Sequence, residues 1–279
     1  MLKLGGGRSI RLSKWLAPGT TLLDICSGKI VSVGVKDSVE DVLEIFAKKF
    51  RRAPVIDDRG YVRGMVSASD VLKVLGGWLE FSRIEPRKRL DVKMGDIMSA
   101  HLLHIDGKMD LPSVIDYFRR HRRGAFPVLR QKKLEGMITE HDIVRQIKGK
   151  TGIRTREAMV RKPIVAQDTY TTSDVAKMLS MGGFRRLPVM RDGALVGIIT
   201  PRDILGYLYQ NNLTEKVRWQ GHPVRSIMTE DVATTGPDAD LHEAVRVIVE
   251  RKVGGLPVVS GSDLLGIITE RDIVDAVQY

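Results

Sequence analysis

Four short elements carry a hydroxyl group and a carboxylate at one fixed spacing. Each reads glycine, two apolar residues, Ser or Thr, two further residues and Asp, and they span residues 64–70, 136–142, 197–203 and 266–272. A hydroxyl residue followed three positions later by an acidic residue is typical of a helix N-terminus, where the hydroxyl caps a free amide and the carboxylate bonds back. We therefore predict that helices begin directly after Ser67, Thr139, Thr200 and Thr269.

The same turn has the chemistry to bind a nucleotide. Its unpaired amides and the positive end of the helix dipole favour a phosphate, and its carboxylate can accept hydrogen bonds from both hydroxyls of a ribose. The candidate ribose-binding residues are Asp70, Asp142, Asp203 and Asp272. The candidate phosphate-binding groups on these turns are the four capping residues, together with Arg202 and Arg271. A cap and a ligand contact are compatible, so the spacing alone leaves both roles open.

The four elements belong to four copies of one repeated unit. Their Asp residues lie 72, 61 and 69 positions apart, and a set of upstream residues repeats at the same intervals: Cys26, Met98, Met159 and Met228. A Pro-Val pair precedes each glycine by nine or ten residues. Motifs that recur together four times at the same intervals identify an internal repeat.

Each copy has the same predicted order of elements. A short strand, such as Val31–Val35 or Ile164–Ala166, comes before a helix with apolar residues at i, i+3, i+4 and i+7, as in 39–46 and 111–118. The third copy has Thr172 at the first of these positions. Two strands joined by a tight turn follow, and the capped helix closes the copy. The sequence therefore predicts α/β (α+β) repeats of order β-α-β-β-α, each about 60 to 70 residues long.

These motifs resemble the CBS domain, and the resemblance covers about 250 residues of the chain. Four copies in one chain are similar to the γ subunit of AMP-activated protein kinase and its stand-alone archaeal relatives. The resemblance implies that the repeats pair through their strands into two Bateman modules that form a disc. It also implies a regulatory, allosteric binder of AMP, ADP or ATP in clefts between paired repeats. S-adenosylmethionine is a less favoured ligand, and no catalytic cofactor is implied.

The resemblance further implies which side chains reach the phosphates. In the family these are basic residues near the Pro-Val strand, and the planar fork of arginine suits the task. The candidates here are Arg51, Arg52, Arg122, Arg123, Arg185, Arg186, Arg251 and Lys252. For each of them a solvated helix end is the alternative. Lys252 lies five residues before its proline whereas Arg186 lies two before, which separates the fourth pair from the others.

An apolar slot for adenine is the third implied feature. Family analogy lines it with the first strand of each repeat, with the residue after each glycine and with the residue before each Pro-Val proline. These are Ile30, Leu103, Ile164 and Ala233; Met65, Met137, Ile198 and Ile267; and Ala53, Phe126, Leu187 and Leu256. Most of them would be core residues in any α/β repeat, so both roles stay open.

Polar and basic stretches divide the chain. We predict a basic N-terminal arm at 1–20, either flexible or docked through Trp15-Leu16, and repeats at 21–81, 93–148, 153–210 and 222–279. Linkers are expected near 82–93, 148–156 and 211–224, with the middle one separating two pairs of repeats.

The positive charge lies in the first half of the chain. Residues 1–150 hold 29 basic and 18 acidic residues, whereas residues 151–279 hold 16 of each, so the net charge of +11 comes from the first half. Such asymmetry fits either an acidic partner or a solvated surface. A nucleic-acid-binding protein is therefore one rival function, although no reader motif or aromatic stacking platform supports it. A ligand-free assembly scaffold is the other.

Other classes are not expected. No apolar run approaches the roughly 18 to 20 residues of a membrane span, the first residues lack a leader pattern, and Cys26 is the only cysteine, so we expect a cytoplasmic protein. The six histidines have no metal-binding spacing and no catalytic fingerprint is present, so we expect neither a metal site nor enzyme activity. Exposed helices offer surfaces for a homodimer or for a protein partner that reads the ligand state.

Overall fold

The computed structural model describes residues 9–28, 30–76, 78, 81, 83–211 and 221–278. The first copy contains β2 (Val33–Gly34), α2 (Val39–Glu44), the π-helix η2 (Ile45–Lys49), β3 (Arg52–Ile56), β4 (Val62–Ser67) and α3 (Ala68–Gly76). The second contains α4 (Met94–Ile97), β5 (Ile105–Asp106), α5 (Leu111–His121), β6 (Ala125–Arg130), β7 (Lys133–Thr139) and α6 (Glu140–Val144). The third contains α7 (Thr155–Ala158), β8 (Val160–Arg161), β9 (Ala166–Gln167), α8 (Thr172–Met181), β10 (Leu187–Arg191), β11 (Ala194–Ile199) and α9 (Pro201–Gln210). The fourth contains η6 (Val224–Ser226), α11 (Leu241–Glu250), β12 (Gly255–Ser260), β13 (Asp263–Thr269) and α12 (Glu270–Ala276).

The described residues also form β1 (Ile10–Arg11), η1 (Leu12–Lys14), α1 (Leu22–Ile25), η4 (Arg87–Asp91) and β14 (Val277–Gln278). The last linker expected near 211–224 lies mostly in 212–220, outside the described residues.

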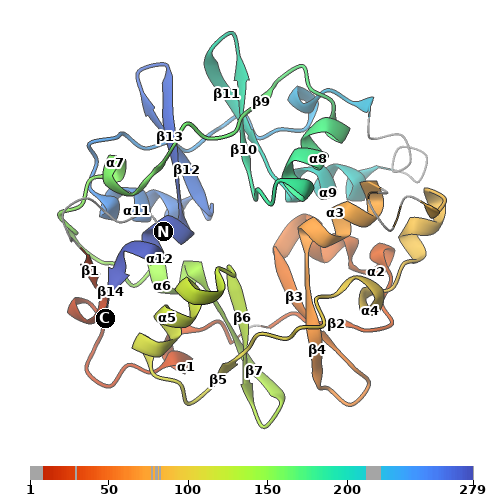
Figure 1. Ribbon diagram of the computed structural model, residues 1–279, viewed down its shortest axis with the longest axis horizontal. Coiled ribbons are helices and arrows are strands. Elements are labelled where there is room, and N and C mark those ends of the chain that lie inside the picture. The colour runs from red at the N-terminus through yellow and green to blue at the C-terminus, as the bar shows by residue number, and fades with distance from the viewer. Residues whose placement is uncertain are drawn as a thin grey trace. The chain divides into compact units, whose positions relative to one another are not determined.

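Each predicted hairpin is present and is the long pair of arrows in its part of Figure 1. In the first three copies a short first strand runs parallel to the hairpin, giving the sheets β2-β3-β4, β5-β6-β7 and β9-β10-β11. The fourth copy differs from the predicted order, because its first segment makes only one parallel bridge, between Thr235 and Val258. Its hairpin instead takes β8 on the other side.

The helical periodicity correctly identified the buried faces. Val39, Val42, Leu43 and Phe46 of the first copy are at most 1% exposed. Thr172, which broke the apolar pattern of the third copy, is also fully buried at 0% exposure. The pattern did not predict that the first helix changes to π geometry at Ile45.

The chain packs as two compact units that combine alternate repeats. Unit 1 consists of 1–30, 103–163 and 232–279, and unit 2 of 31–102 and 164–231. Each unit has one hydrophobic core. In unit 1, α12 packs against α6 and α5; in unit 2, α3 packs against α8 and α9, and α9 against η2. The middle linker, 148–156, lies inside unit 1.

Four short segments explain why the sulfur-containing residues repeat at the same intervals as the glycine-containing elements. They are the crossing segments, 26–28, 98–100, 159–161 and 228–230, and each runs antiparallel along the second hairpin strand of another repeat. The amide of Ser27, for example, donates to the carbonyl of Met137 at 3.0 Å. The sulfur-containing residue of each segment lies over the glycine of that strand: Cys26 over Gly136, Met98 over Gly64, Met228 over Gly197 and Met159 over Gly266. Glycine is required because a β-carbon there would collide with the crossing segment.

The described part of the N-terminal arm packs into unit 1. β1 pairs in parallel with β14, and Ile10 and Leu12 are buried at 1% and 0% exposure. Trp15 and Leu16 pack against the same core. Among the described residues, no helix has both the length and the hydropathy needed to cross a bilayer.

We expect Gly266→Ala to destabilise the protein by about 1–3 kcal/mol, because a β-carbon at this position would lie 2.7 Å from the backbone oxygen of Val160. Gly136→Ala meets only the Cys26 sulfur within 3 Å, so adding Cys26→Ala should restore its stability. Met159→Ala should not rescue Gly266→Ala in the same way.

Chemical denaturation would measure these differences. Gly236→Ala is the control, since a β-carbon there meets nothing within 4 Å. A Gly266→Ala protein as stable as the control would contradict the close approach of the crossing segment.

Candidate functional site

All four predicted helix caps are present, and they share one geometry. One oxygen of each carboxylate, Oδ2, accepts hydrogen bonds from the backbone amide of the capping residue at 2.7–2.9 Å and from its hydroxyl at 2.6–2.7 Å. Because the cap occupies Oδ2, only the other oxygen, Oδ1, retains its full capacity to accept bonds. The helix start therefore fixes the direction in which Oδ1 is presented.

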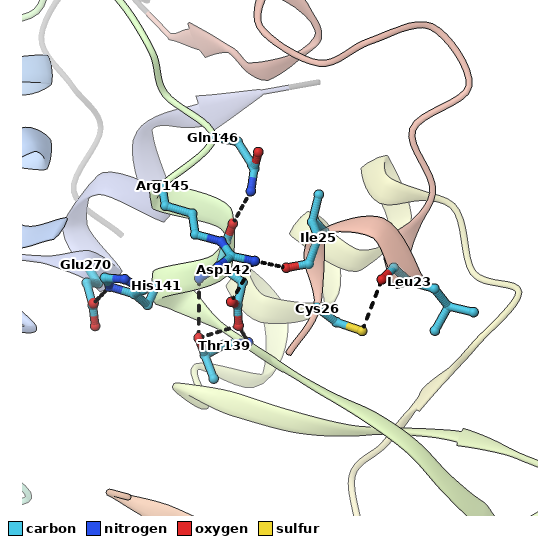
Figure 2. A network of polar contacts seen from close by, with 9 residues as sticks. All are labelled: Leu23, Ile25, Cys26, Thr139, His141, Asp142, Arg145, Gln146 and Glu270. Atoms are coloured by element: carbon cyan, nitrogen blue, oxygen red, sulfur yellow. Dashed lines mark hydrogen bonds and ion pairs between the residues drawn. The ribbon is translucent and has the colours of Figure 1, made fainter. Parts of the chain in front are cut away.

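The surroundings of Oδ1 differ among the repeats. Figure 2 shows Arg145 between Asp142 and the end of α1: its guanidinium lies 3.4 Å from Asp142 Oδ1 and donates to the carbonyl of Ile25 at 2.6 Å. Asp142 is only 5% exposed. By contrast, the side chain of Asp70 is 33% exposed, with Lys73 at 3.9 Å. The carboxylate of Asp142 in the second repeat is therefore more enclosed than that of Asp70 in the first repeat.

Thr229 is a site residue that the sequence did not identify. It belongs to a crossing segment, pairs with Ile198 and donates its hydroxyl to Asp203 Oδ1 at 3.4 Å. The shared spacing of Met228 with the other three sulfur-containing residues was the one signal that this segment lies at a fixed place in the repeat. That spacing did not show which repeat it contacts.

Burial distinguishes two of these carboxylates from other capping residues. It raises the pKa of Asp142 and of Asp203, although both accept hydrogen bonds from their capping threonines. The same capping box at the starts of α1, α2 and α8 lies at the surface, where hydrogen bonds lower the pKa of Asp24, Asp41 and Asp174. Burial thus makes two of the candidate ribose-binding groups easier to protonate.

The basic pairs fall into two structural classes. Arg51, Arg52, Arg185 and Arg186 are half-buried beside a helix start, and the carbonyl of Arg51 accepts from the first amide of α3 at 3.0 Å. Arg122, Arg123, Arg251 and Lys252 are exposed at the ends of α5 and α11. Arg122 and Lys252 have positive φ angles of 50° and 53°. The second class matches the alternative of a solvated helix end.

Arg202 and Arg271 each connect two repeats within a unit. Arg202 donates to the carbonyl of Lys48 at 3.0 Å. Arg271 donates to Glu140 at 2.7–2.8 Å and to the carbonyl of Arg122, and Glu140 is 3% exposed. In the reciprocal pair, His141 Nδ1 lies 2.8 Å from Glu270, as Figure 2 shows. These contacts join the starts of α6 and α12.

The predicted adenine-pocket residues separate by burial. Ala53, Phe126, Leu187 and Leu256 are at most 1% exposed and belong to the cores. The residues after the glycines pair with the crossing segments; they are Met65, Met137, Ile198 and Ile267. Of these, Met65 and Ile198 are half-buried. Ile30, Leu103 and Ala233 are half-buried, whereas Ile164 is 52% exposed. Only the residues after the glycines are brought together with a crossing segment.

No group of three or more His, Cys, Asp or Glu side chains suited to a metal ion occurs in the ranges that the structure describes. Cys26, half-buried beneath Gly136, has its thiol pKa raised by burial.

Comparison with known proteins identifies the class. The CBS domain matches four segments, 22–77, 94–149, 156–210 and 224–279. The chain belongs to the CBS-domain family.

Two archaeal proteins resemble the chain along most of their length. Protein MJ1225 of Methanocaldococcus jannaschii is 28% identical over 264 residues, which cover 88% of this chain and 94% of that protein. Its crystal structure, described as a proposed archaeal homolog of g-AMPK, has a TM-score of 0.85 and 26% identity over 92% of this chain and 99% of that chain. A 33.4 kDa protein of the ribosomal RNA operon of Thermofilum pendens is 25% identical over 265 residues, 88% of each chain. A shorter likeness, over 45% of this chain and 96% of that chain, is to CBSX2 in complex with AMP, at 26% identity and a TM-score of 0.40.

Asp203 and Asp174 should have opposite effects on the pH dependence of stability. The raised pKa of Asp203 adds stability that is full at low pH and is lost as the pH rises through that pKa. The lowered pKa of Asp174 adds stability that is present at neutral pH and is lost on acidification. The stability difference between wild type and Asp203→Asn should therefore fall from acid to neutral pH, and that for Asp174→Asn should rise.

Urea denaturation from about pH 2 to pH 7 would measure both trends, because the contribution of Asp174 is lost only below the ordinary pKa of an aspartate. Two slopes of the same sign would show that burial does not dominate at Asp203.

Arg271→Met should cost about 3–5 kcal/mol of folding stability, because it removes the ion pair that Arg271 makes with the buried Glu140. Replacing both residues with methionine should recover most of the loss, since the uncompensated charge is then removed. Thermal and chemical unfolding would test this expectation. A loss below about 1 kcal/mol would place the pair with ordinary surface ion pairs.

Proposed function

We propose that this chain is a regulatory protein that binds adenine nucleotides, AMP, ADP or ATP, at the capped helix starts of its CBS repeats. Membership of the family and the likeness to MJ1225 along nearly the whole chain support the proposal. The observation that carries it is the geometry of the carboxylates, in which the cap holds Oδ2 and directs Oδ1 away from the cap. A ribose diol needs an acceptor of this kind next to a helix dipole that favours phosphate.

The four positions are not equally suited to a ligand. Asp70, Asp203 and Asp272 are partly exposed, whereas Asp142 is buried under Arg145. A nucleotide at Asp142 would have to displace the bond from Arg145 to Ile25. We therefore assign the first ligands to the other three repeats.

Regulation would follow from the contacts that join helix starts within a unit. Arg271 directly precedes Asp272, and Glu140 directly follows the capping Thr139. A ligand that shifts the start of one helix also moves the Arg271–Glu140 ion pair, and the ion pair transmits the shift to the start of the other helix. Binding that favours one arrangement over another then changes the surface offered to a protein partner or to a second copy of the chain. The chain itself carries out no catalysis in this proposal.

Calorimetry with AMP, ADP, ATP and S-adenosylmethionine, after removal of copurified small molecules, tests the proposal. We expect AMP or ADP to bind tightest. Asp203→Ala or Asp272→Ala should weaken its site roughly tenfold to a hundredfold, because a hydrogen bond to a charged group contributes about 1.5–3 kcal/mol. Ligand at about 100 times its dissociation constant should stabilise the fold by about 2.7 kcal/mol.

Asp174→Ala is the matched control, because it removes the same capping box from α8, outside the glycine-containing elements. It should reduce stability and leave affinity unchanged. If Asp203→Ala and Asp272→Ala bind every adenosyl ligand as wild type does, those carboxylates are only helix caps. If no ligand raises the melting temperature, the ligand-free assembly scaffold becomes the favoured function. If RNA or duplex DNA binds in moderate salt and AMP does not compete, nucleic-acid binding becomes the favoured function.

A further inference from the structure

The strand register shows which residues of different repeats occupy equivalent places around the helix starts. Arg52 lies opposite the capping Ser67, Ala125 opposite Thr139, and Gly255 opposite Thr269. In the third repeat Leu187 lies opposite Ile199, which places Arg186 next to Thr200. The basic pairs that the sequence groups together are therefore not equivalent in space.

In unit 2 both helix starts carry arginines at the equivalent places. Arg51-Arg52 and Arg185-Arg186 occupy the two positions before the core residue of the hairpin, and all four are half-buried. The first helical residues are the uncharged Ala68 and Pro201. These arginines lie beside α3 and α9, which have 9 and 10 residues.

In unit 1 the same places are neutral or acidic. Gly124-Ala125 and Gly254-Gly255 replace the arginine pairs. The first helical residues are Glu140 and Glu270, which are 3% and 4% exposed. The basic side chains that do lie nearby, at 122–123 and 251–252, are exposed at helix ends.

Arg202 brings a further cation from the third repeat to the arginine pair of the first repeat. It comes from α9 in the third repeat and donates to the carbonyl of Lys48 in the first repeat, three residues before Arg51. Burial and the charge of Arg51 both lower the pKa of the Arg202 guanidinium, so these two side chains are close enough to repel each other. In unit 1 the equivalent Arg271 is held instead by Glu140. Unit 2 therefore has arginine pairs at the positions before its hairpin core residues, whereas unit 1 has glycine or alanine there and buried glutamates at its first helical positions.

We infer that unit 2 selects nucleotides with two or three phosphates at Asp70 and Asp203, and that the repeats of unit 1 accept a ligand with at most one phosphate. This inference rests on the proposed function and adds a division of ligands between the two units. A di- or triphosphate places several negative charges near the helix start, and arginine binds phosphate oxygens bidentately. In unit 1 those charges would meet Glu140 and Glu270 in a site with little water, where like charges repel strongly.

The experiment measures AMP and ATP binding by calorimetry, without magnesium, to proteins that keep only one unit's carboxylates. With Asp142→Asn and Asp272→Asn together, the remaining unit 2 sites should bind ATP at least about tenfold more tightly than AMP. With Asp70→Asn and Asp203→Asn together, the remaining unit 1 sites should bind AMP at least as tightly as ATP. Inorganic tripolyphosphate should compete with ATP only in the first protein.

Arg185→Met with Arg186→Met tests the arginines directly. It should reduce the preference for ATP about tenfold in the protein that keeps unit 2, with a smaller loss of AMP affinity. The control is Lys177→Met with Arg225→Met, which removes two exposed positive charges from the same unit and should leave the preference unchanged. Circular dichroism and melting curves would confirm that each protein is folded before binding is compared.

The outcomes separate the two proposals. Equal ATP-to-AMP ratios in the two proteins, with binding intact, would overturn the division of ligands and leave nucleotide binding standing. The same holds if the control pair lowers the ratio as much as the arginine pair does. Absence of all adenosyl binding by wild type would instead overturn the proposed function.

Discussion

A carboxylate oxygen shared by an amide and a hydroxyl closes the start of each helix that follows a hairpin. This interaction fixes the rotamer of the aspartate and leaves its second oxygen pointing in a direction set by the backbone. The helix cap and the candidate ligand group are therefore one structure. Glycine at the start of the same element lets a crossing segment lie against the strand, and in the third repeat Thr229 of that segment donates to Asp203 Oδ1 at 3.4 Å.

The capping box alone does not create a binding group. The chain uses the box with Ser or Thr at the cap and Asp three residues later at seven helix starts that the structure describes, counting Ser67 with Asp70. At α1, α2 and α8 the carboxylate lies at the surface, and hydrogen bonding lowers its pKa. At Asp142 and Asp203 enclosure reverses the direction of the shift. The difference arises from packing, because the local sequence and the local hydrogen bonds are the same.

The four hairpins share one register, yet the residues around the helix starts that follow them differ among the repeats. Glu140 and Glu270 are buried, Glu140 in an ion pair with Arg271 and Glu270 with its carboxylate 2.8 Å from His141 Nδ1. Their counterparts in unit 2 are Ala68 and Pro201, and arginine pairs precede the core residue of each hairpin there. A common backbone thus carries two different electrostatic environments at its helix starts.

The sequence by itself determined the four repeats, the caps, the hairpins and the buried faces of the long helices. These depend on spacing along the chain, and local propensities and periodicity record that spacing. It could not determine which repeats pack together, or why the sulfur-containing residues repeat at the same intervals as the glycines. It also could not determine that Arg122 and Arg51 occupy different places relative to the helix starts. Those features depend on strand register and on contacts between residues far apart in the chain, such as Ser27 with Met137. Only the tertiary structure decided them, because burial and the sign of a local charge are properties of the neighbours that folding brings together.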